Sequence, residues 1–343
     1  MLAYRLFDDG PRLADVPVPK PGDGQVLVKI AGAGVCHSDL HVINSIPTGK
    51  SFFKPPFTLG HESTGWVEAV GSGVTTLTPG EPVAVYCARG CGRCRMCVAG
   101  NENYCMNTKE LSGLGLGLDG GMASHMLVPA ARYCIPLGDL EPRDAAPLTD
   151  AGLTPYHAVN RSRALLTPDA TAVVIAVGGL GHMALQILRA TTAVRIVALD
   201  VSDEKLALAK ELGADVTIRS DADALKNTLD ALGGVGADVV FDFVGLQSTQ
   251  DLARKLVRPG GDCNIVGLGG GVLQYGQGRV AFGVRVFTPY FGSIGEMREV
   301  LALAARGHLR AHVTRYPLER VADAYKAMHA GTLEGRAVIC PNG

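Results

Sequence analysis

The chain has 343 residues, of which 47% are hydrophobic and 19% charged, with 44 glycines and a formal net charge of -1. This length suggests two domains, and the composition excludes a disordered or fibrous chain and favours a compact α/β enzyme. The absence of a basic patch, of a secretory signal and of a sufficiently apolar long segment argues against nucleic-acid binding, export and membrane insertion, and favours a soluble cytoplasmic protein.

The chain shows two successive patterns of predicted secondary structure. Before residue 150, short apolar runs between Gly and Pro predict strands of a β-rich domain at 25–30, 63–70 and 81–86. Strands and helices then alternate, with strands at 171–177, 195–199, 238–244 and 263–266 and helices at 182–189 and 204–212. This alternation predicts a parallel sheet with helices on both faces. Beyond 290 we expect helices at 296–306 and 318–330 and a strand at 336–339.

Four cysteines, Cys91, Cys94, Cys97 and Cys105, stand in one short loop. Thiolates at this spacing can converge on one tetrahedron, the geometry of closed structural Zn²⁺ sites. Two disulfides are the alternative, but bridges between such close cysteines would be strained, and nothing else in the chain suggests an oxidising compartment. The loop therefore predicts a structural zinc, which identifies a scaffold and carries no chemistry itself.

A glycine-rich turn, Gly178-Gly179-Leu180-Gly181, separates the predicted strand at 171–177 from the next helix. Such a turn lets a pyrophosphate approach backbone N–H groups at a helix N-terminus, although it can also be a simple tight turn. Asp200 ends the following strand, where its carboxylate would bind the adenosine ribose 2′-OH and repel a 2′-phosphate. These residues favour NAD over NADP, with Lys205 as the only close cation. Ala176 occupies the place expected for the first glycine.

Other metal-capable residues are scattered: Cys36, His61 with Glu62, and Asp150. Their spacing alone cannot join them. Cys36 could be a small buried hydrophobe, and His61-Glu62 a satisfied pair in a loop.

The order of these motifs resembles the zinc-dependent medium-chain alcohol dehydrogenases over nearly the whole chain. The motifs are Gly34-Val-Cys-His-Ser38, Gly60-His-Glu62, the cysteine loop and Val177-Gly-Gly-Leu-Gly181, and segments 147–157 and 240–245 are similar to bacterial NAD-dependent secondary-alcohol dehydrogenases. The resemblance implies an α/β protein with two domains. Residues 1–152 and 291–343 would form a GroES-like catalytic domain with a zinc lobe at about 88–107, and 153–290 a doubly wound Rossmann NAD-binding domain.

The resemblance also implies roles for single residues at the catalytic metal. Cys36, His61 and Asp150 would hold the catalytic Zn²⁺ with a fourth place open, and many relatives have cysteine where this chain has Asp150. Glu62 would be a neighbour that can approach the metal, and Asp39 would orient the His61 ring. Two zinc ions per chain are therefore expected, one catalytic and one structural.

Proton transfer, cofactor binding and the substrate pocket are implied in the same way. Ser38 would contact the substrate oxygen, and His41 would pass the proton outward. Further cofactor contacts are expected at His37, Val244, Val266 and Arg336, whereas Ile294 stands where close relatives tend to carry arginine. The expected pocket wall, Phe52, Phe53, Cys87 and Phe291, has no cation to clamp a carboxylate or phosphate.

The function implied is reversible hydride transfer between NAD(H) and a neutral, preferably secondary, alcohol or its ketone, in a homodimer or homotetramer. Two alternatives stay open at this point. One is the same chemistry on primary or aryl alcohols and their aldehydes. The other is a non-catalytic binding module that keeps the zinc-stapled scaffold.

Overall fold

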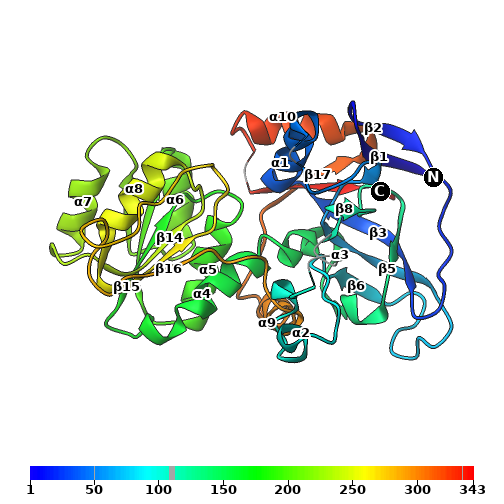
Figure 1. Cartoon of the computed structure of the whole chain (residues 1–343), viewed down its shortest axis with the longest axis horizontal. Coiled ribbons are helices and arrows are strands. Elements are labelled where there is room, and N and C mark those ends of the chain that lie inside the picture. The colour runs from blue at the N-terminus through cyan, green and yellow to red at the C-terminus, as the bar shows by residue number, and fades with distance from the viewer. Residues whose placement is uncertain (50, 108–112, 334) are drawn as a thin grey trace. The chain divides into compact units, whose positions relative to one another are not determined.

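The computed structural model describes residues 1–49, 51–107, 113–333 and 335–343. They form two compact units. Unit 1 contains Met1–Asp150, Ser293–Ala305 and Ala311–Gly343, and unit 2 contains Ala151–Gly292 and Arg306–Arg310. The chain thus leaves unit 1 after Asp150 and re-enters it at Ser293, and both termini belong to unit 1 (Figure 1).

Unit 1 is built mainly from β-strands. The strands are β1 (Leu2–Phe7), β2 (Gly10–Asp15), β3 (Val26–Gly34), β4 (Phe57–Thr58), β5 (Glu62–Val70), β6 (Pro82–Val85), β7 (Gly113–Leu114), β8 (Gly117–Leu118), β9 (His125–Val128), β10 (Cys134–Pro136), β17 (Val313–Pro317) and β18 (Arg336–Cys340). The α-helices are α1 (His37–Ser45), α2 (Arg95–Val98), α3 (Pro142–Ala145), α9 (Ile294–Ala305) and α10 (Val321–His329). The 3₁₀ turns are η1 (Ile46–Thr48), η2 (Glu102–Tyr104), η4 (Ala131–Tyr133), η5 (Ala146–Thr149) and η7 (Leu318–Arg320).

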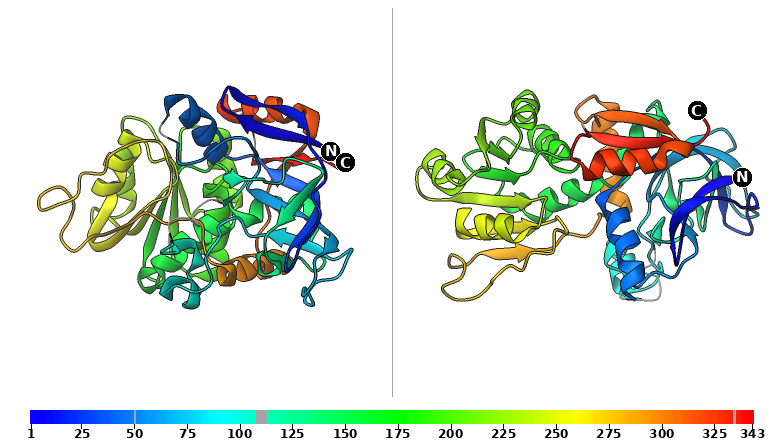
Figure 2. Two further views of the ribbon diagram at one scale, coloured as in Figure 1. Left: turned by 45° about the vertical axis from the view of Figure 1, so that its right-hand side comes forward. Right: turned by 90° about the horizontal axis from the view of Figure 1, so that it is seen from above.

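The largest sheet of unit 1 places β3 at its centre. Its strands follow the order β10-β6-β5-β3-β18-β17, and β9 also pairs with β3. All residues of β3 except Lys29 are buried, as expected for a strand covered on both faces. The C-terminal strand β18 runs antiparallel to β3, so the end of the chain (red) returns beside its beginning (blue) in both views of Figure 2. β3 therefore collects neighbours from distant parts of the sequence.

Unit 2 is a parallel sheet covered by helices. Its strands are β11 (Thr171–Ile175), β12 (Arg195–Asp200), β13 (Val216–Arg219), β14 (Ala237–Asp242), β15 (Val257–Ile265) and β16 (Arg285–Phe287). Its helices are α4 (Leu153–Arg161), α5 (Gly181–Thr191), α6 (Asp203–Glu211), α7 (Ala224–Ala231) and α8 (Gln247–Leu256), with the 3₁₀ turn η6 (Arg163–Leu165). Helix α8 lies on one side of the strands and α4 and α5 on the other (Figure 1).

The strand order in unit 2 is β13-β12-β11-β14-β15-β16, with every neighbouring pair parallel. The order reverses between β11 and β14, and ligands of doubly wound sheets bind at such a switch point, beyond the carboxyl ends of the strands. Branched apolar side chains such as Val173, Val197 and Val240 fill the core beneath it. The expected fold class, a β-rich unit and a doubly wound parallel-sheet unit, is confirmed.

Several element boundaries differ from those expected, and two of the differences change the local conformation. The strand expected to run to Val177 ends at Ile175, because Ala176 adopts a left-handed φ of 72° and turns the chain. The helix expected from Leu318 starts with the 3₁₀ turn η7 and becomes α-helical at Val321. Within the part of the chain that the structure describes, no helix is both long and apolar enough to cross a membrane.

Candidate metal and cofactor sites

Cys36 and His61 meet because of how two neighbouring strands pair. β3 ends at Gly34 and β5 begins at Glu62, and these two residues are opposite each other in the antiparallel register. Cys36 follows one strand end and His61 precedes the other, so both lie at the same sheet edge. A Cβ on Gly34 would lie 2.0 Å from a Glu62 carboxylate oxygen, so a larger residue would displace this carboxylate. Asp150 reaches the same place from the end of η5, which packs against both strands.

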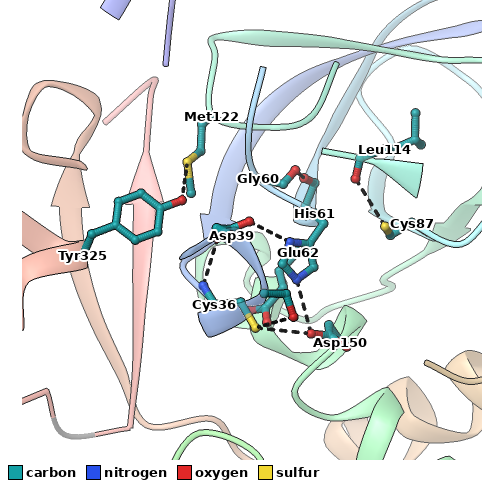
Figure 3. A network of polar contacts seen from close by, with 12 residues as sticks. Cys36, Asp39, Gly60, His61, Glu62, Cys87, Leu114, Met122, Asp150 and Tyr325 are labelled. Carbon is teal, nitrogen blue, oxygen red and sulfur yellow. Dashed lines mark hydrogen bonds and ion pairs between the residues drawn. The ribbon is translucent and has the colours of Figure 1, made fainter. Parts of the chain in front are cut away.

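Four side chains converge here on one buried point (Figure 3). The Cys36 sulfur lies 3.7 Å from Asp150 Oδ2, and His61 Nε2 lies 3.3 Å from the same oxygen. One possible ligand atom from each of these residues and from Glu62 lies within 4.8 Å of all the others. Thiolate, imidazole and carboxylate are the donors that Zn²⁺ prefers. The donor set therefore fits a zinc ion.

Asp39 holds two of these residues at once. Its Oδ1 lies 2.9 Å from His61 Nδ1, and its Oδ2 accepts a hydrogen bond of 3.1 Å from the backbone N–H of Cys36. The side chains of Asp39 and His61 are fully buried. Because the bond to Nδ1 fixes the ring and keeps Nε2 directed to the cluster, Asp39 is placed as expected of a residue that orients a metal-binding histidine.

The charges around the cluster favour a cation. Burial alone would lower the pKa of His61, but the carboxylates of Asp39 and Asp150 outweigh burial and raise it well above its usual value. Burial raises the pKa of Glu62 to about 7 against the opposing effect of Arg336. The second carboxylate oxygen of Glu62 has no hydrogen-bond partner within the described residues. A buried oxygen of this kind is costly unless a proton or a metal ion satisfies it, which agrees with the zinc-binding donor set.

Arg336 has a buried partner within unit 1. The resemblance implied a contact with the cofactor, and the guanidinium also forms a buried ion pair with Glu62. The pairing follows from β18 lying beside β3, with Val338 opposite Gly34. Burial opposes the charge on Arg336, yet the Glu62 carboxylate raises the arginine pKa above its usual value. A contact with a cofactor stays a prediction.

The residues expected to move protons lie on α1, directly after Cys36. The Ser38 hydroxyl lies 3.6 Å from the Cys36 sulfur, beside the cluster. His37 and His41 stand four residues apart, on one face of the helix, and both are exposed. Partial desolvation and the nearby Arg336 guanidinium lower the pKa of His37. His41 is thus open to solvent, as an outward relay requires, and its relay role stays a prediction.

The expected pocket residues have diverse surroundings. Cys87 is buried, its thiol donates to the Leu114 carbonyl at 3.2 Å, and burial raises its pKa to about 12, so it stays a neutral thiol. Phe53 is half-buried and packs edge-on against Phe57 with ring centroids 6.4 Å apart. Phe52 is 93% exposed, so its side chain does not line a cavity within unit 1. Phe291 belongs to unit 2, is buried, and has a left-handed φ of 48°.

The cysteine loop brings its four thiols together. Sulfur–sulfur distances are 4.0 Å for Cys91–Cys97, 3.5 Å for Cys94–Cys97 and 4.0 Å for Cys94–Cys105. All four are free cysteines, which removes the disulfide alternative. A zinc–sulfur bond of about 2.3 Å implies tetrahedral edges of about 3.8 Å, so the spacing fits one zinc ion. Backbone N–H groups of Cys97 and Met106 lower the pKa of Cys94 to about 6, towards the thiolate that binds metal.

The glycine-rich turn has the placement expected of a nucleotide-binding turn. It joins β11 to α5 at the switch point of the unit 2 sheet, and α5 begins at Gly181. A Cβ on Gly181 would lie 1.8 Å from the Ala176 carbonyl oxygen, so glycine lets helix and strand pack closely. Gly178, Gly179 and Leu180 are only half-buried. Val266 directly follows β15, and its N–H donates to the Asp242 carbonyl at 2.9 Å.

Asp200 and Val244 line one cavity of about 540 Å³ beside this turn. The Asp200 carboxylate accepts hydrogen bonds from the N–H groups of Val177 at 2.7 Å and Ser202 at 3.0 Å, which fix its orientation. The cavity also contains Lys255 from α8 as well as Lys205. The expectation that Lys205 is the only close cation is therefore wrong. Sequence spacing could not reveal Lys255, since it is 50 or more residues from the other lining groups on β12 and α6 and depends on how α8 packs.

Two family models match this chain. Residues 22–139 match the alcohol dehydrogenase GroES-like domain, and residues 179–306 match the zinc-binding dehydrogenases. The first match spans the cysteine loop and the segments that supply Cys36 and His61. The second starts in the glycine-rich turn and includes the rest of the parallel sheet.

Full-length relatives agree with these matches. The NAD-dependent alcohol dehydrogenase of Sulfurisphaera tokodaii is 36% identical over 99% of this chain and 100% of its own. The crystal structure of the alcohol dehydrogenase from Aeropyrum pernix is similar with a TM-score of 0.92 and 38% identity, covering 99% of this chain and 100% of that one. Acetophenone reductase from Geotrichum candidum, solved in complex with NAD, gives a TM-score of 0.87 and 32% identity over 99% and 96% of the two chains.

Proposed function

We propose that this chain, which belongs to the family of zinc-binding dehydrogenases with an alcohol dehydrogenase GroES-like domain, transfers hydride reversibly between NAD(H) and a neutral alcohol or its carbonyl product. The observation that carries the proposal is the convergence of Cys36, His61 and Asp150 from three separate segments of the chain on one buried point. In this proposal unit 1 supplies the catalytic groups and unit 2 binds the cofactor, with functional domain boundaries near 152 and 290.

Cys36, His61 and Asp150 would hold the catalytic zinc, and the four cysteines of the loop a structural zinc. A zinc ion at the first site supplies Lewis acidity that favours the deprotonated form of an alcohol and polarises a carbonyl. Asp150 is a harder, more weakly donating ligand than a cysteine thiolate, which favours a more electrophilic metal. Asp39 keeps the His61 ring in the orientation that presents Nε2 to the metal.

The chain's own groups would handle the proton. Ser38 lies beside the cluster, where its hydroxyl can accept the proton of a substrate alcohol and pass it on. His41 on the exposed face of α1 would deliver it to solvent, because an imidazole can accept a proton at one ring nitrogen and donate one from the other. His37 and Arg336 are the proposed contacts of unit 1 with the cofactor pyrophosphate.

NAD is the proposed cofactor because an acid ends β12. The Asp200 carboxylate keeps free lone pairs after its two backbone bonds, so it can accept from a ribose hydroxyl. The same charge would repel a 2′-phosphate, although Lys205 and Lys255 in the cavity weaken that repulsion. Assays with NADH and NADPH side by side test this choice, and equal kcat/KM for both cofactors would contradict it.

The proposed substrates are neutral secondary alcohols and ketones. The expected pocket residues Phe53, Cys87 and Phe291 are uncharged, so they offer no partner to an anionic group. Small Cys87 favours a bulky substituent, and a ketone reductase stands among the similar structures. The rival preference is for primary or aryl alcohols and aldehydes. Comparing kcat/KM within matched pairs, 1-butanol with 2-butanol and benzyl alcohol with 1-phenylethanol, distinguishes the two preferences.

The central experiment compares two cysteine variants. We expect Cys36→Ser to lose turnover and to retain one of the two zinc ions per chain, with the fold preserved and only a small fall in the unfolding temperature. Cys340→Ser, a buried cysteine of β18 outside the cluster, serves as the matched control with activity retained. Wild-type turnover in Cys36→Ser would exclude the assigned metal site. Absence of NADH turnover on every alcohol and ketone, together with a single bound zinc in the wild type, would instead favour the binding module.

Assembly into a homodimer or homotetramer is part of the proposal. Light scattering after size-exclusion chromatography measures the mass directly, and a mass near 36 kDa, that of one chain, would contradict it.

A further inference from the structure

The cysteine loop is tied to a distant helix by one carboxylate. Glu102 stands in η2, between the third and fourth cysteines of the loop. Its side chain accepts a hydrogen bond from the backbone N–H of Ile294, the first residue of α9, 192 residues later. Glu102 is only 9% exposed, and a Cβ on Gly90 would lie 2.7 Å from its own Cβ, so it is packed into the loop.

This bond completes the start of α9. The first N–H groups of a helix have no partner inside it, and a carboxylate there is favoured by the helix dipole. Ser293 and Glu296 already cap each other: the Glu296 N–H donates to Ser293 Oγ at 3.2 Å, and the Ser293 N–H donates to Glu296 Oε2 at 2.9 Å. Glu102 satisfies the next donor, at Ile294, from outside the helix. The first turn of α9 is thereby attached to the cysteine loop.

The anchored residue directly follows a strained segment. Ser293 is where the chain re-enters unit 1, and two residues earlier Phe291 has a φ of 48°. A bulky residue in the left-handed region persists only where its surroundings over-determine it. Phe291 packs edge-on against Tyr290 with ring centroids 4.9 Å apart. A fixed point at Ile294 restricts the conformations open to residues 290–293.

We propose that Glu102 is a positioning residue that couples the cysteine loop to the start of α9 and so restrains the segment that bears Phe291. The cysteine loop, on this view, has a task beyond stabilising its own lobe: it fixes the first turn of α9, which follows the segment that bears Phe291. The pocket role of Phe291 rests on the function proposed above, whereas the coupling between loop and helix does not.

Hydrogen–deuterium exchange tests the coupling without any assay of activity. We expect Glu102→Ala to raise exchange at 292–296 about tenfold or more, since the half-buried Ile294 N–H loses a charged acceptor. Glu102→Gln, which can still accept this bond, should remain within about threefold of the wild type. Glu299→Ala, on the exposed face of the same helix, is the matched control and should leave exchange unchanged. Unaltered exchange in Glu102→Ala would overturn the proposal.

Metal removal supplies the second arm. Stripping zinc from the wild type with a chelator should raise exchange at 290–296, whereas the same treatment of Glu102→Ala should add nothing there. An equal further rise in both proteins would overturn the coupling through Glu102. For the pocket, we expect Glu102→Ala to raise KM for a ketone several-fold with little change in kcat or in KM for NADH. An exchange effect without turnover in any variant would refute the proposed function but leave the coupling intact.

Discussion

Replacing Asp39 by asparagine tests the carboxylate that holds His61 and Cys36 in place at the metal site. The two residues have the same shape, but the carboxylate accepts from two buried donors, His61 Nδ1–H and the Cys36 N–H. An asparagine side chain has one acceptor oxygen and one NH₂ donor, so in either orientation it faces one of these donors with another donor. One buried N–H is then left unsatisfied, at a cost of about 1–3 kcal/mol.

This loss should appear at the metal. If the His61 ring turns or changes tautomer to escape the clash, Nε2 no longer points at the cluster, and partners of this kind are worth about 10–100-fold in metal affinity or activity. We expect Asp39→Asn to release one zinc per chain about 10–100 times faster to a chromogenic chelator, with the second zinc unaffected. The Cys36→Ser variant identifies which release phase belongs to this site.

Asp8→Asn, the same change at an exposed position, is the control and should match the wild type in zinc release and denaturant unfolding. Wild-type zinc retention and stability in Asp39→Asn would refute the argument that this carboxylate satisfies two donors at once.

Three further changes test other parts of the structure. Cys94→Ser should lower the zinc content to one per chain and the unfolding temperature, because a four-ligand site loses one ligand; an unchanged metal analysis would contradict the loop site. Ala176→Gly should raise the free energy of unfolding by up to about 1 kcal/mol in a denaturant titration, since it relieves a left-handed φ, and a loss would argue against strain there. Burial raises the pKa of Asp242, so the charged form costs stability at neutral pH and this cost vanishes as pH falls below the unfolded value of about 3.9. The amide of Asp242→Asn can donate to Thr249 Oγ1. The free energy of unfolding of this variant, relative to that of the wild type, should therefore increase as pH rises through the acid range. A relative stability that decreases with rising pH would contradict the raised pKa of Asp242.

Local motifs were predictable because their geometry depends on few neighbouring residues. The four cysteines lie within one short loop, and sulfur–sulfur distances of 3.5 to 4.0 Å follow from its turns. The glycine-rich turn and Asp200 likewise belong to consecutive elements of one βαβ unit, whose handedness and strand order are strongly restricted. Neither motif needed a contact between distant segments.

Pairings between distant segments escaped sequence reasoning. The bond between Glu102 and Ile294 and the ion pair between Glu62 and Arg336, 274 residues apart, leave no spacing signal. The sequence predicted only a cofactor contact for Arg336. Its ion pair with the Glu62 carboxylate follows from β18 lying beside β3, which the sequence alone does not specify. Lys255 entered the nucleotide cavity for the same reason, through the packing of α8.

The amino-acid sequence by itself determined which donors this protein has and which chemistry they suit: four clustered thiols, a glycine-rich turn followed by an acid, and a thiol, an imidazole and a carboxylate in separate motifs. Only the tertiary structure decided that Cys36, His61 and Asp150 meet. The physical reason is strand register. A slip of one residue between β3 and β5 would turn every side chain of one strand to the opposite face of the sheet. The observed register is fixed because it buries the apolar side chains of the whole sheet.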